Sequence, residues 1–323
     1  MKEYKLGMIL GGIVILVLIA ALTYSHLGGN SAAEDKKGSK KEKKKGKNKE
    51  AKSDEQSGAE SSSCVAGKLI AAKTWEMPKS LKEISGMAWM GEDKVCAVQD
   101  QKGIIYIYDL QAKKIANEIR FSDNGDYEGI AYAHNIFFVM RSDGQLYEVN
   151  ATGKVVKQYD LPLTETDNIE SLFFDAPNDR LLIGQKDGAG GSKVKKVFSF
   201  DLPARKFNNQ PVYTLDMADP VISCDDNVKA NKKGKKHKEI RPSEIAVNPA
   251  TKDIYIADGP SQRVLVLSAD GKPKYYLEVD KKEFPQVEGL MFDPAGAFYI
   301  STEGVKEAAK ISQVNVEKTA GGN

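Results

Sequence analysis

Histidine and cysteine are scarce in this chain, with three of each among 323 residues. His26, His134 and His237 lie far apart in the sequence, so no Ser-His-Asp or Cys-His combination is indicated. The chain also lacks a phosphate-binding loop, a dinucleotide fingerprint and the spacing of an EF-hand loop. These absences predict no catalytic residue, and they favour a binding protein over an enzyme.

The cysteines, Cys64, Cys96 and Cys224, are irregularly spaced. They form no CxxC pair and no zinc-binding spacing, and they indicate no disulfide framework. Cys96 lies in the apolar run "KVCAVQD" and is predicted to be a small buried hydrophobic residue.

Long uncharged runs are absent except at residues 6–24, which carry no charge over nineteen positions. As a helix this segment would be about 28 Å long, enough to cross a bilayer. We therefore predict an uncleaved membrane anchor, and a cleaved signal peptide is the alternative. Lys2 and Lys5 favour a cytoplasmic amino terminus, whereas ten lysines from Lys36 to Lys52 oppose it, so charge alone does not settle the topology.

Three parts of the chain differ in composition. Residues 1–27 hold the predicted cytoplasmic tip and anchor, and residues 28–63 have almost no apolar side chain, which predicts a disordered, lysine-rich linker. Residues 1–63 contain 12 lysines and 8 acidic residues, so residues 64–323 contain 35 basic and 37 acidic ones. Six of those basic residues lie in "KANKKGKKHK" at 229–238. The remaining body is acidic, which argues against nucleic acid and for a cation as partner.

Helical periodicity is missing from residues 64–323, where a strand pattern instead repeats every 40 to 50 residues or so. Each repeat has a short apolar strand, a turn, an alternating strand, a polar loop and a third strand, and most have a fourth. This pattern predicts an all-β, five-bladed β-propeller. The repeats begin with the stretches "ISGMAW", "YEGIAY", "IESLFF", "PSEIAV" and "VEGLMF".

The last repeat ends after three strands, and "KLIAAKTWEMP" at 68–78 is predicted to pair beside it and close the ring. The third and fourth repeats are separated by 73 residues instead of the 42 to 45 found elsewhere. We interpret the extra residues as an exposed loop, and a degenerate sixth blade is the alternative.

Acidic residues recur at the beginning of the innermost strands. Because innermost strands surround the central channel of a propeller, equivalent positions should form a ring at one mouth of that channel. Carboxylates gathered there repel one another unless a cation, a proton or water compensates them. Calcium accepts such oxygen ligands, whereas zinc would need Cys or His. Capping of backbone N–H groups or pairing with Arg and Lys is the alternative. The ring positions are Ser85, Glu128, Glu170, Ser243 and Glu288, and the predicted calcium ligands are Glu128, Glu170, Glu288, Glu83 and Ser85.

A second polar set follows the second strand of each repeat. These residues should lie on the top face, defined here as the face on which the innermost strands begin, and should bind an unidentified small molecule or protein. Arg141 and Lys186 are the candidates for contacting an anionic group, and pairing with the ring glutamates is their alternative. The predicted ligand-binding residues are Arg141, Asp100, Lys186, Asp258 and Glu303.

Several stretches resemble the SdiA-regulated domain family of bacterial envelope proteins, over roughly residues 67–316. The resemblance rests on "EISGMAW", "GDYEGIAY", "MRSDGQLYEV" and "FPQVEGLMFDPAGAFYISTEG", and the fourth repeat also resembles an NHL-type repeat. It implies an amino-terminal membrane segment and a calcium-binding propeller on the extracytoplasmic (periplasmic) side of a bacterial cell membrane. The lysine-rich linker and the lysine-rich insertion depart from the family's pattern.

These observations predict a single-pass, membrane-anchored propeller that binds calcium and presents its top face to a ligand or protein. A metal-dependent hydrolase of phosphoesters or esters, working at the acidic mouth, is the alternative. A structural scaffold, in which the glutamates are internal caps, is a third interpretation.

Overall fold

The computed structural model describes residues 64–188, 193–224 and 239–318. In these ranges the chain is built of β-strands, and the helical segments are single 3₁₀ turns at Lys79–Leu81, Ala176–Asn178 and Gly259–Ser261. No helix among the described residues is long and apolar enough to cross a membrane. The predicted anchor and linker (1–27 and 28–63) lie outside the described residues. Residues 59–323 form a compact unit by themselves, and all the described strands pair with one another within it.

Three antiparallel sheets of four strands each follow one another along the chain. The first contains β2 (Ile84–Gly91), β3 (Lys94–Gln99), β4 (Lys102–Asp109) and β5 (Lys114–Asn124). The second contains β6 (Tyr127–Ala133), β7 (Ile136–Arg141), β8 (Gln145–Val149) and β9 (Val155–Asp160). The third contains β10 (Ile169–Asp175), β11 (Arg180–Gln185), β12 (Val194–Asp201) and β13 (Lys206–Asp216).

A fourth sheet has eight strands, in two halves of four. One half contains β14 (Pro242–Val247), β15 (Ile254–Asp258), β16 (Arg263–Leu267) and β17 (Pro273–Glu278). The other contains β18 (Val287–Phe292), β19 (Phe298–Thr302), β20 (Lys310–Lys318) and, from the start of the chain, β1 (Val65–Glu76). A short parallel contact between β1 and β17 joins the halves.

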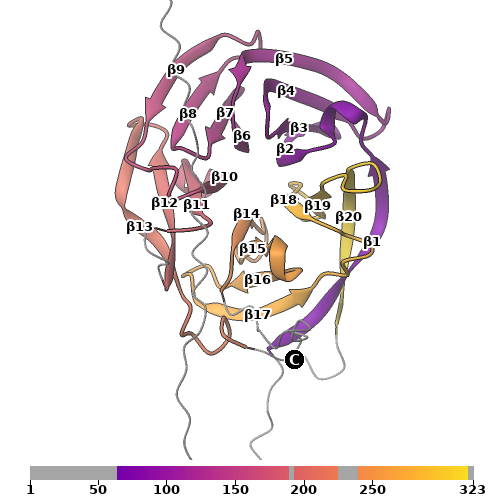
Figure 1. The fold of residues 1–323 in the computed structure, drawn as a ribbon, viewed down its shortest axis with the longest axis vertical. Coiled ribbons are helices and arrows are strands. Elements are labelled where there is room, and N and C mark those ends of the chain that lie inside the picture. Colours follow the sequence, from indigo (N-terminus) through magenta and orange to yellow (C-terminus); the bar gives the residue numbers. More distant parts are fainter. Residues whose placement is uncertain (1–63, 189–192, 225–238, 319–323) are drawn as a thin grey trace, which may run out of the picture. The chain divides into compact units, whose positions relative to one another are not determined.

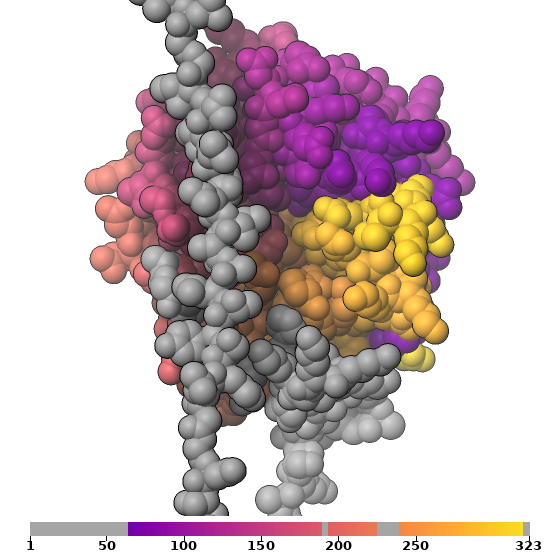
Figure 2. All heavy atoms as spheres, viewed as in Figure 1, coloured from indigo at the N-terminus to yellow at the C-terminus, as the bar shows by residue number. Residues whose placement is uncertain are grey.

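The closing strand lies where the sequence predicts it. β1 pairs antiparallel with β20 from Gly67 opposite Lys318 to Glu76 opposite Lys310. Figures 1 and 2 show the indigo beginning and the yellow end of the described chain side by side. The last repeat thus receives its fourth strand from the beginning of the domain, and the ring of sheets is closed without a free edge at this point.

The sheets surround a common centre, with the first strand of each sheet innermost and the fourth outermost (Figure 1). Apolar side chains alternate with polar ones along the strands and fill the space between neighbouring sheets. Each hydrophobic cluster joins two neighbours; one, for example, packs Met87 and Tyr106 of the first sheet against Met291, Tyr299 and Ile311 near the end of the chain. The molecule is a β-propeller, as the repeat predicts.

A β-bulge recurs at the second residue of every innermost strand. The register between the first and second strands shifts there in all of the sheets, including both halves of the fourth. The residue after the bulge packs against the next sheet: a Cβ on Gly129 would lie 2.7 Å from the Leu172 Cβ. Glycine is required where backbones approach so closely. The bulged residues are Ser85, Glu128, Glu170, Ser243 and Glu288, which are the five predicted ring positions.

The cysteines correct one sequence prediction. Cys64 and Cys224 form a disulfide across 160 residues of sequence, although their spacing suggested no such framework. Tertiary structure brings them together, because Cys64 directly precedes β1 and Cys224 ends the turns that follow β13. Cys96 is free and fully buried, as predicted. The residues between β13 and β14 that the structure describes form turns, and the lysine-rich stretch at 229–238 lies outside the described residues.

Candidate functional site

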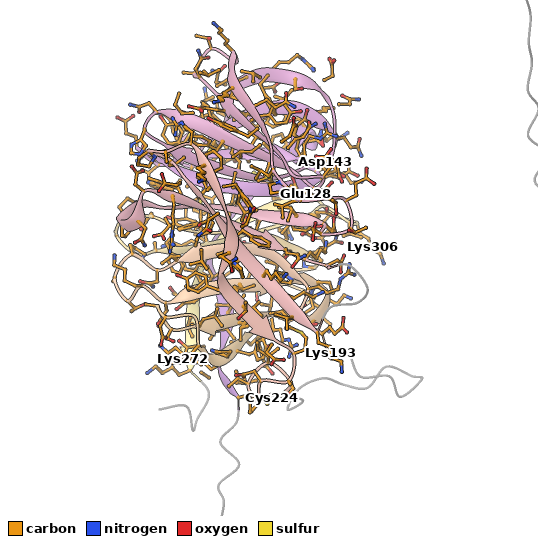
Figure 3. All side chains as sticks on the ribbon, turned by 90° about the vertical axis from the view of Figure 1, so that its left-hand side faces the viewer. Glu128, Asp143, Lys193, Cys224, Lys272 and Lys306 are labelled. Carbon is orange, nitrogen blue, oxygen red and sulfur yellow. A yellow bond between two sulfur atoms is a disulfide. The ribbon has the colours of Figure 1, made fainter. Side chains whose placement is uncertain are left out.

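The ring glutamates lie toward one face of the propeller. In Figure 3, Glu128 lies toward the side that carries Asp143, Lys193 and Lys306, whereas Lys272 lies on the opposite side. Asp143, Lys193 and Lys306 belong to loops between the second and third strands of their sheets. Lys272 belongs to the turn between the third and fourth strands, β16 and β17. The top face therefore carries both the bulges and the loops after the second strands, because each strand reverses direction relative to the one before it.

Lys186 is the counter-charge at the centre of this site. Its Nζ lies 2.8 Å from Oε2 of Glu170, and the Glu170 side chain is only 7% exposed. Although burial opposes it, the carboxylate of Glu170 and then those of Glu288 and Glu128 raise the pKa of Lys186. The ring therefore holds one firmly protonated ammonium among three carboxyl groups.

A single ammonium does not neutralise the ring. Burial, followed by the neighbouring carboxylate of Glu170, raises the pKa of Glu128 to about 9. Burial also raises the pKa of Glu288 to about 7, and the Lys186 ammonium opposes that increase. Without a further cation, Glu128 therefore holds a proton at neutral pH. The site has more carboxylates than positive charges to pair with them.

The serine positions of the ring join neighbouring sheets. Ser85 Oγ donates to the backbone oxygen of Tyr127 at 2.6 Å, and Ser243 Oγ donates to that of Val287 at 3.0 Å. Each acceptor is the residue immediately before a ring glutamate, so the serines hold the next bulge in place. Ser85 is a predicted calcium ligand. Its O–H group donates the hydrogen bond to Tyr127, and the lone pairs of the same oxygen are still able to accept a cation.

The remaining predicted metal ligand, Glu83, lies outside the ring positions. Its carboxylate accepts a hydrogen bond of 3.0 Å from the side-chain amide of Gln101. It also interacts electrostatically with Asp100 and Glu303, and together with burial it raises the pKa of both groups. Glu83 therefore belongs to an outer acidic layer rather than to the group around Lys186.

The predicted ligand-binding residues separate into two groups. Lys186 belongs to the ring site. Glu303 lies close enough to Lys186 and Glu170 to interact with their charges, and Asp100 lies close enough to interact with Glu83. By contrast, Arg141 pairs with Asp143 at 2.8 Å and Asp258 is fully buried against Arg263. The structure thus brings Lys186, Glu303 and Asp100 toward the acidic mouth, and engages Arg141 and Asp258 in intramolecular pairs.

Four further residues complete the electrostatics of the top face. Glu244, directly after the Ser243 bulge, is 1% exposed, and its Oε2 has no hydrogen-bond partner. Burial raises its pKa well above the usual range. Burial raises the pKa values of Glu128 and Glu170, and Asp126 adds to both increases. Arg241 pairs with Asp187 at 2.8 Å. Glu244 replaces the glycine or serine found after the other bulges, which is the sequence signal that could have singled it out.

Calcium ligation has a mixed fit to this arrangement. Carboxylate and carbonyl oxygens are the ligands calcium prefers, and a buried oxygen without a partner lies nearby on Glu244. In the part of the chain that the structure describes, no group of three or more His, Cys, Asp or Glu side chains is arranged to hold a metal ion. Glu128, Glu170 and Glu288 are instead gathered around Lys186, so an ion and this ammonium would be alternative partners for the same carboxylates.

Comparison with known proteins supports the fold alone. No family model matches the chain, and no curated protein sequence matches it. Among solved structures, the glutaminyl cyclase of Myxococcus xanthus, a β-propeller, is similar with a TM-score of 0.57 and 10% identity, over 79% of this chain and 99% of that one. The WD40 repeats of RRP9 match with a TM-score of 0.48 and 8% identity, over 77% of this chain and 99% of that one. At 10% identity, the similarity to the cyclase supports the propeller fold alone.

Proposed function

We propose that this chain is a five-bladed, membrane-anchored propeller of the bacterial cell envelope that binds calcium and a ligand or protein at its top face. Three separate sheets and the two halves of the fourth, each with four strands, support a count of five blades. Residues 1–27 would be the cytoplasmic tip and anchor, residues 28–63 the linker, and residues 64–323 the propeller. The stretches shared with the SdiA-regulated domain family agree with this organisation.

The extracytoplasmic location is supported by the Cys64–Cys224 disulfide. Disulfides persist in oxidising compartments such as the periplasm and are rare in the cytosol of mesophiles. A propeller tethered by an uncleaved anchor would therefore lie outside the cytoplasmic membrane. Alkylation of the cysteines in intact cells, before and after reduction, tests this location; two freely reactive thiols at Cys64 and Cys224 without reductant would contradict it.

The observation that carries the calcium proposal is the unbalanced charge around Lys186. Glu128 has a pKa of about 9 and Glu288 one of about 7, so the ring cannot ionise fully with the cations it has. A divalent ion would supply the missing charge, and Glu128, Glu170 and Glu288 are the residues that would hold it, with Glu83 and Ser85 as the outer members of the predicted set. Calcium would contribute positive charge to which an anionic group of a ligand could bind.

The competition between calcium and Lys186 makes the proposal testable. We expect calcium to raise the melting temperature of residues 59–323, and Glu128→Gln with Glu288→Gln to abolish that increase. Lys186→Met removes the competing ammonium and should increase calcium affinity measured by isothermal titration calorimetry. Equal melting of the wild type in calcium and in chelator would refute the calcium proposal.

A second function is favoured by one observation. A carboxyl group with a pKa of about 9 is protonated at neutral pH and could donate a proton, which suits Glu128 as a general acid beside a metal held by Glu170 and Glu288. The alternative function is therefore a metal-dependent hydrolase of phosphoesters or esters at the acidic mouth. Turnover of a phosphoester and ester panel that is lost in Glu128→Gln would support it, and a peptide with amino-terminal glutamine tests the activity named for the solved cyclase. Absence of turnover with every metal tried would leave the binding function.

A further inference from the structure

The opposite end of the channel is built differently from the acidic mouth. A cavity of about 420 Å³ opens there, and side chains of all the innermost strands line it. The turns between first and second strands form its rim, including residues 176–177 and 248–249. This end is called the bottom face here, because it lies opposite the top face along each innermost strand.

The two-residue period of a strand explains the change in chemistry along the channel. Two residues after each bulge comes an apolar side chain that is at most 2% exposed. Each of these side chains belongs to a hydrophobic cluster between neighbouring sheets, and Met87, Ile130 and Leu172 also line the cavity. Along every innermost strand this apolar layer lies between the bulge and the cavity wall. The layer consists of Met87, Ile130, Leu172, Ile245 and Leu290.

The next step of two residues brings larger side chains to the cavity wall. Four of these five positions are aromatic, and all five are only partly buried. Their rings are held from behind: Trp89 lies 5.8 Å from Tyr299, and Phe292 stacks on Phe298 at 4.6 Å between ring centroids. The cavity therefore has a rigid, preformed aromatic wall. The wall residues are Trp89, Tyr132, Phe174, Val247 and Phe292.

The charged groups at the rim are already satisfied within the protein. Asp175 accepts hydrogen bonds of 2.8 Å from both Arg180 and Asn178. Asp293 accepts the backbone N–H of Ala297 at 2.8 Å, and Lys252 donates to a backbone oxygen. Each of the three has a hydrogen-bond partner, and acidic and basic groups lie together at the rim, so the rim favours neither an anion nor a cation.

We propose that this cavity binds a small, neutral, aromatic molecule. Its volume lies within the range of roughly 300 to 1,000 Å³ found for small-molecule sites. Preformed aromatic walls stack edge-on or offset against a flat ring, which a flexible aliphatic chain does not match. The site is separate from the calcium site and from the function proposed for the top face, because its wall lies four residues farther along each innermost strand than the bulge.

The test is calorimetric titration of residues 59–323, in chelator, with 2-naphthol as the aromatic probe and cyclohexanol as the aliphatic one. We expect saturable 1:1 binding of 2-naphthol with a Kd below about 1 mM and binding of cyclohexanol at least about three-fold weaker. Val247→Trp fills the cavity and should weaken 2-naphthol binding at least about ten-fold. Val156→Trp makes the same change on the exposed strand β9, where the valine is 54% exposed, and should alter the Kd by less than about two-fold.

Phe174→Leu provides a second variant in case Val247→Trp disturbs folding. It removes a wall ring with a small change in volume and should weaken 2-naphthol binding about five-fold while leaving cyclohexanol binding unchanged. Glu128→Gln should have no effect on either probe. Absence of saturable 2-naphthol binding would overturn the proposal. So would wild-type affinity in both Val247→Trp and Phe174→Leu, or binding that is lost only in Glu128→Gln, which would place the probe at the acidic mouth.

Discussion

Removal of the Cys64–Cys224 disulfide should strongly reduce the stability of the domain. The bond closes a loop of 160 residues, which contains the first three sheets of the propeller. In the chain-entropy model, closing a loop of this length lowers the entropy of the unfolded state enough to stabilise the fold by about 5 kcal/mol. The bond also fastens the beginning of β1, the strand on which ring closure depends.

The assay is urea denaturation of residues 59–323, with Cys64→Ser plus Cys224→Ser compared with the wild type. We expect the double variant to lose about 3 to 5 kcal/mol of unfolding free energy, since measured effects of native disulfides fall at or below the model value. Dithiothreitol should destabilise the wild type by the same amount and leave the double variant unchanged. Cys96→Ala serves as the control that keeps the bond and should remain sensitive to reductant.

A loss below about 1 kcal/mol would refute this reasoning. It would mean either that the two cysteines are not joined in the folded protein or that β1 is held by its pairing with β20 alone. Mass analysis of the alkylated, unreduced protein separates these cases, because a joined pair leaves only Cys96 to react after unfolding.

Three further predictions concern the ring and the core. Because burial raises the pKa of Glu128 to about 9, the folded state keeps a proton that the unfolded state releases near pH 4.5. The calcium-free domain should therefore lose stability as pH rises from about 4.5 to about 9, and Glu128→Gln should flatten that dependence in thermal melts. Arg263→Met leaves the fully buried Asp258 without its partner and should cost about 3 kcal/mol in urea denaturation, whereas Lys272→Met, in an exposed pair, should leave the midpoint unchanged. Gly129→Ala places a Cβ 2.7 Å from the Leu172 Cβ and should cost about 1 to 3 kcal/mol by the same assay; wild-type stability would show that the sheets can separate there.

Much of the fold could be predicted from local pattern. Strand alternation, turn residues and a repeat of similar length are properties of neighbouring residues, so they identify the sheets and their order. The closing role of residues 68–78 follows from the missing fourth strand of the last repeat, and the structure confirms it with β1 beside β20. The disulfide could not be predicted, because no local pattern relates Cys64 to Cys224 across 160 residues.

The candidate site was only partly predictable. Equivalent repeat positions identify Glu128, Glu170 and Glu288 as a group, since rotation about the channel brings equivalent residues together. The pattern does not show that Lys186 lies among them. Its pairing with Glu170 depends on the tertiary position of the residue that follows β11 relative to the bulge in β10. Likewise, Ser85 and Ser243 occupy the same repeat position as the glutamates, yet their hydroxyls donate hydrogen bonds to the backbone of the neighbouring sheet.

The sequence by itself determined that residues 64–323 form repeated antiparallel sheets and that acidic residues recur at the start of innermost strands, since both follow from short-range periodicity. Tertiary structure alone decided which charged groups are buried close together, and this is why Glu128 and Glu288 have raised pKa values. It also decided that Arg141 pairs with Asp143 and Asp258 with Arg263. It also decided that the innermost strands pass from carboxylates at the top face to a buried apolar layer and then to the aromatic wall of a cavity. The physical reason is that burial and electrostatic interaction depend on distances between residues far apart in the chain, which no local pattern contains.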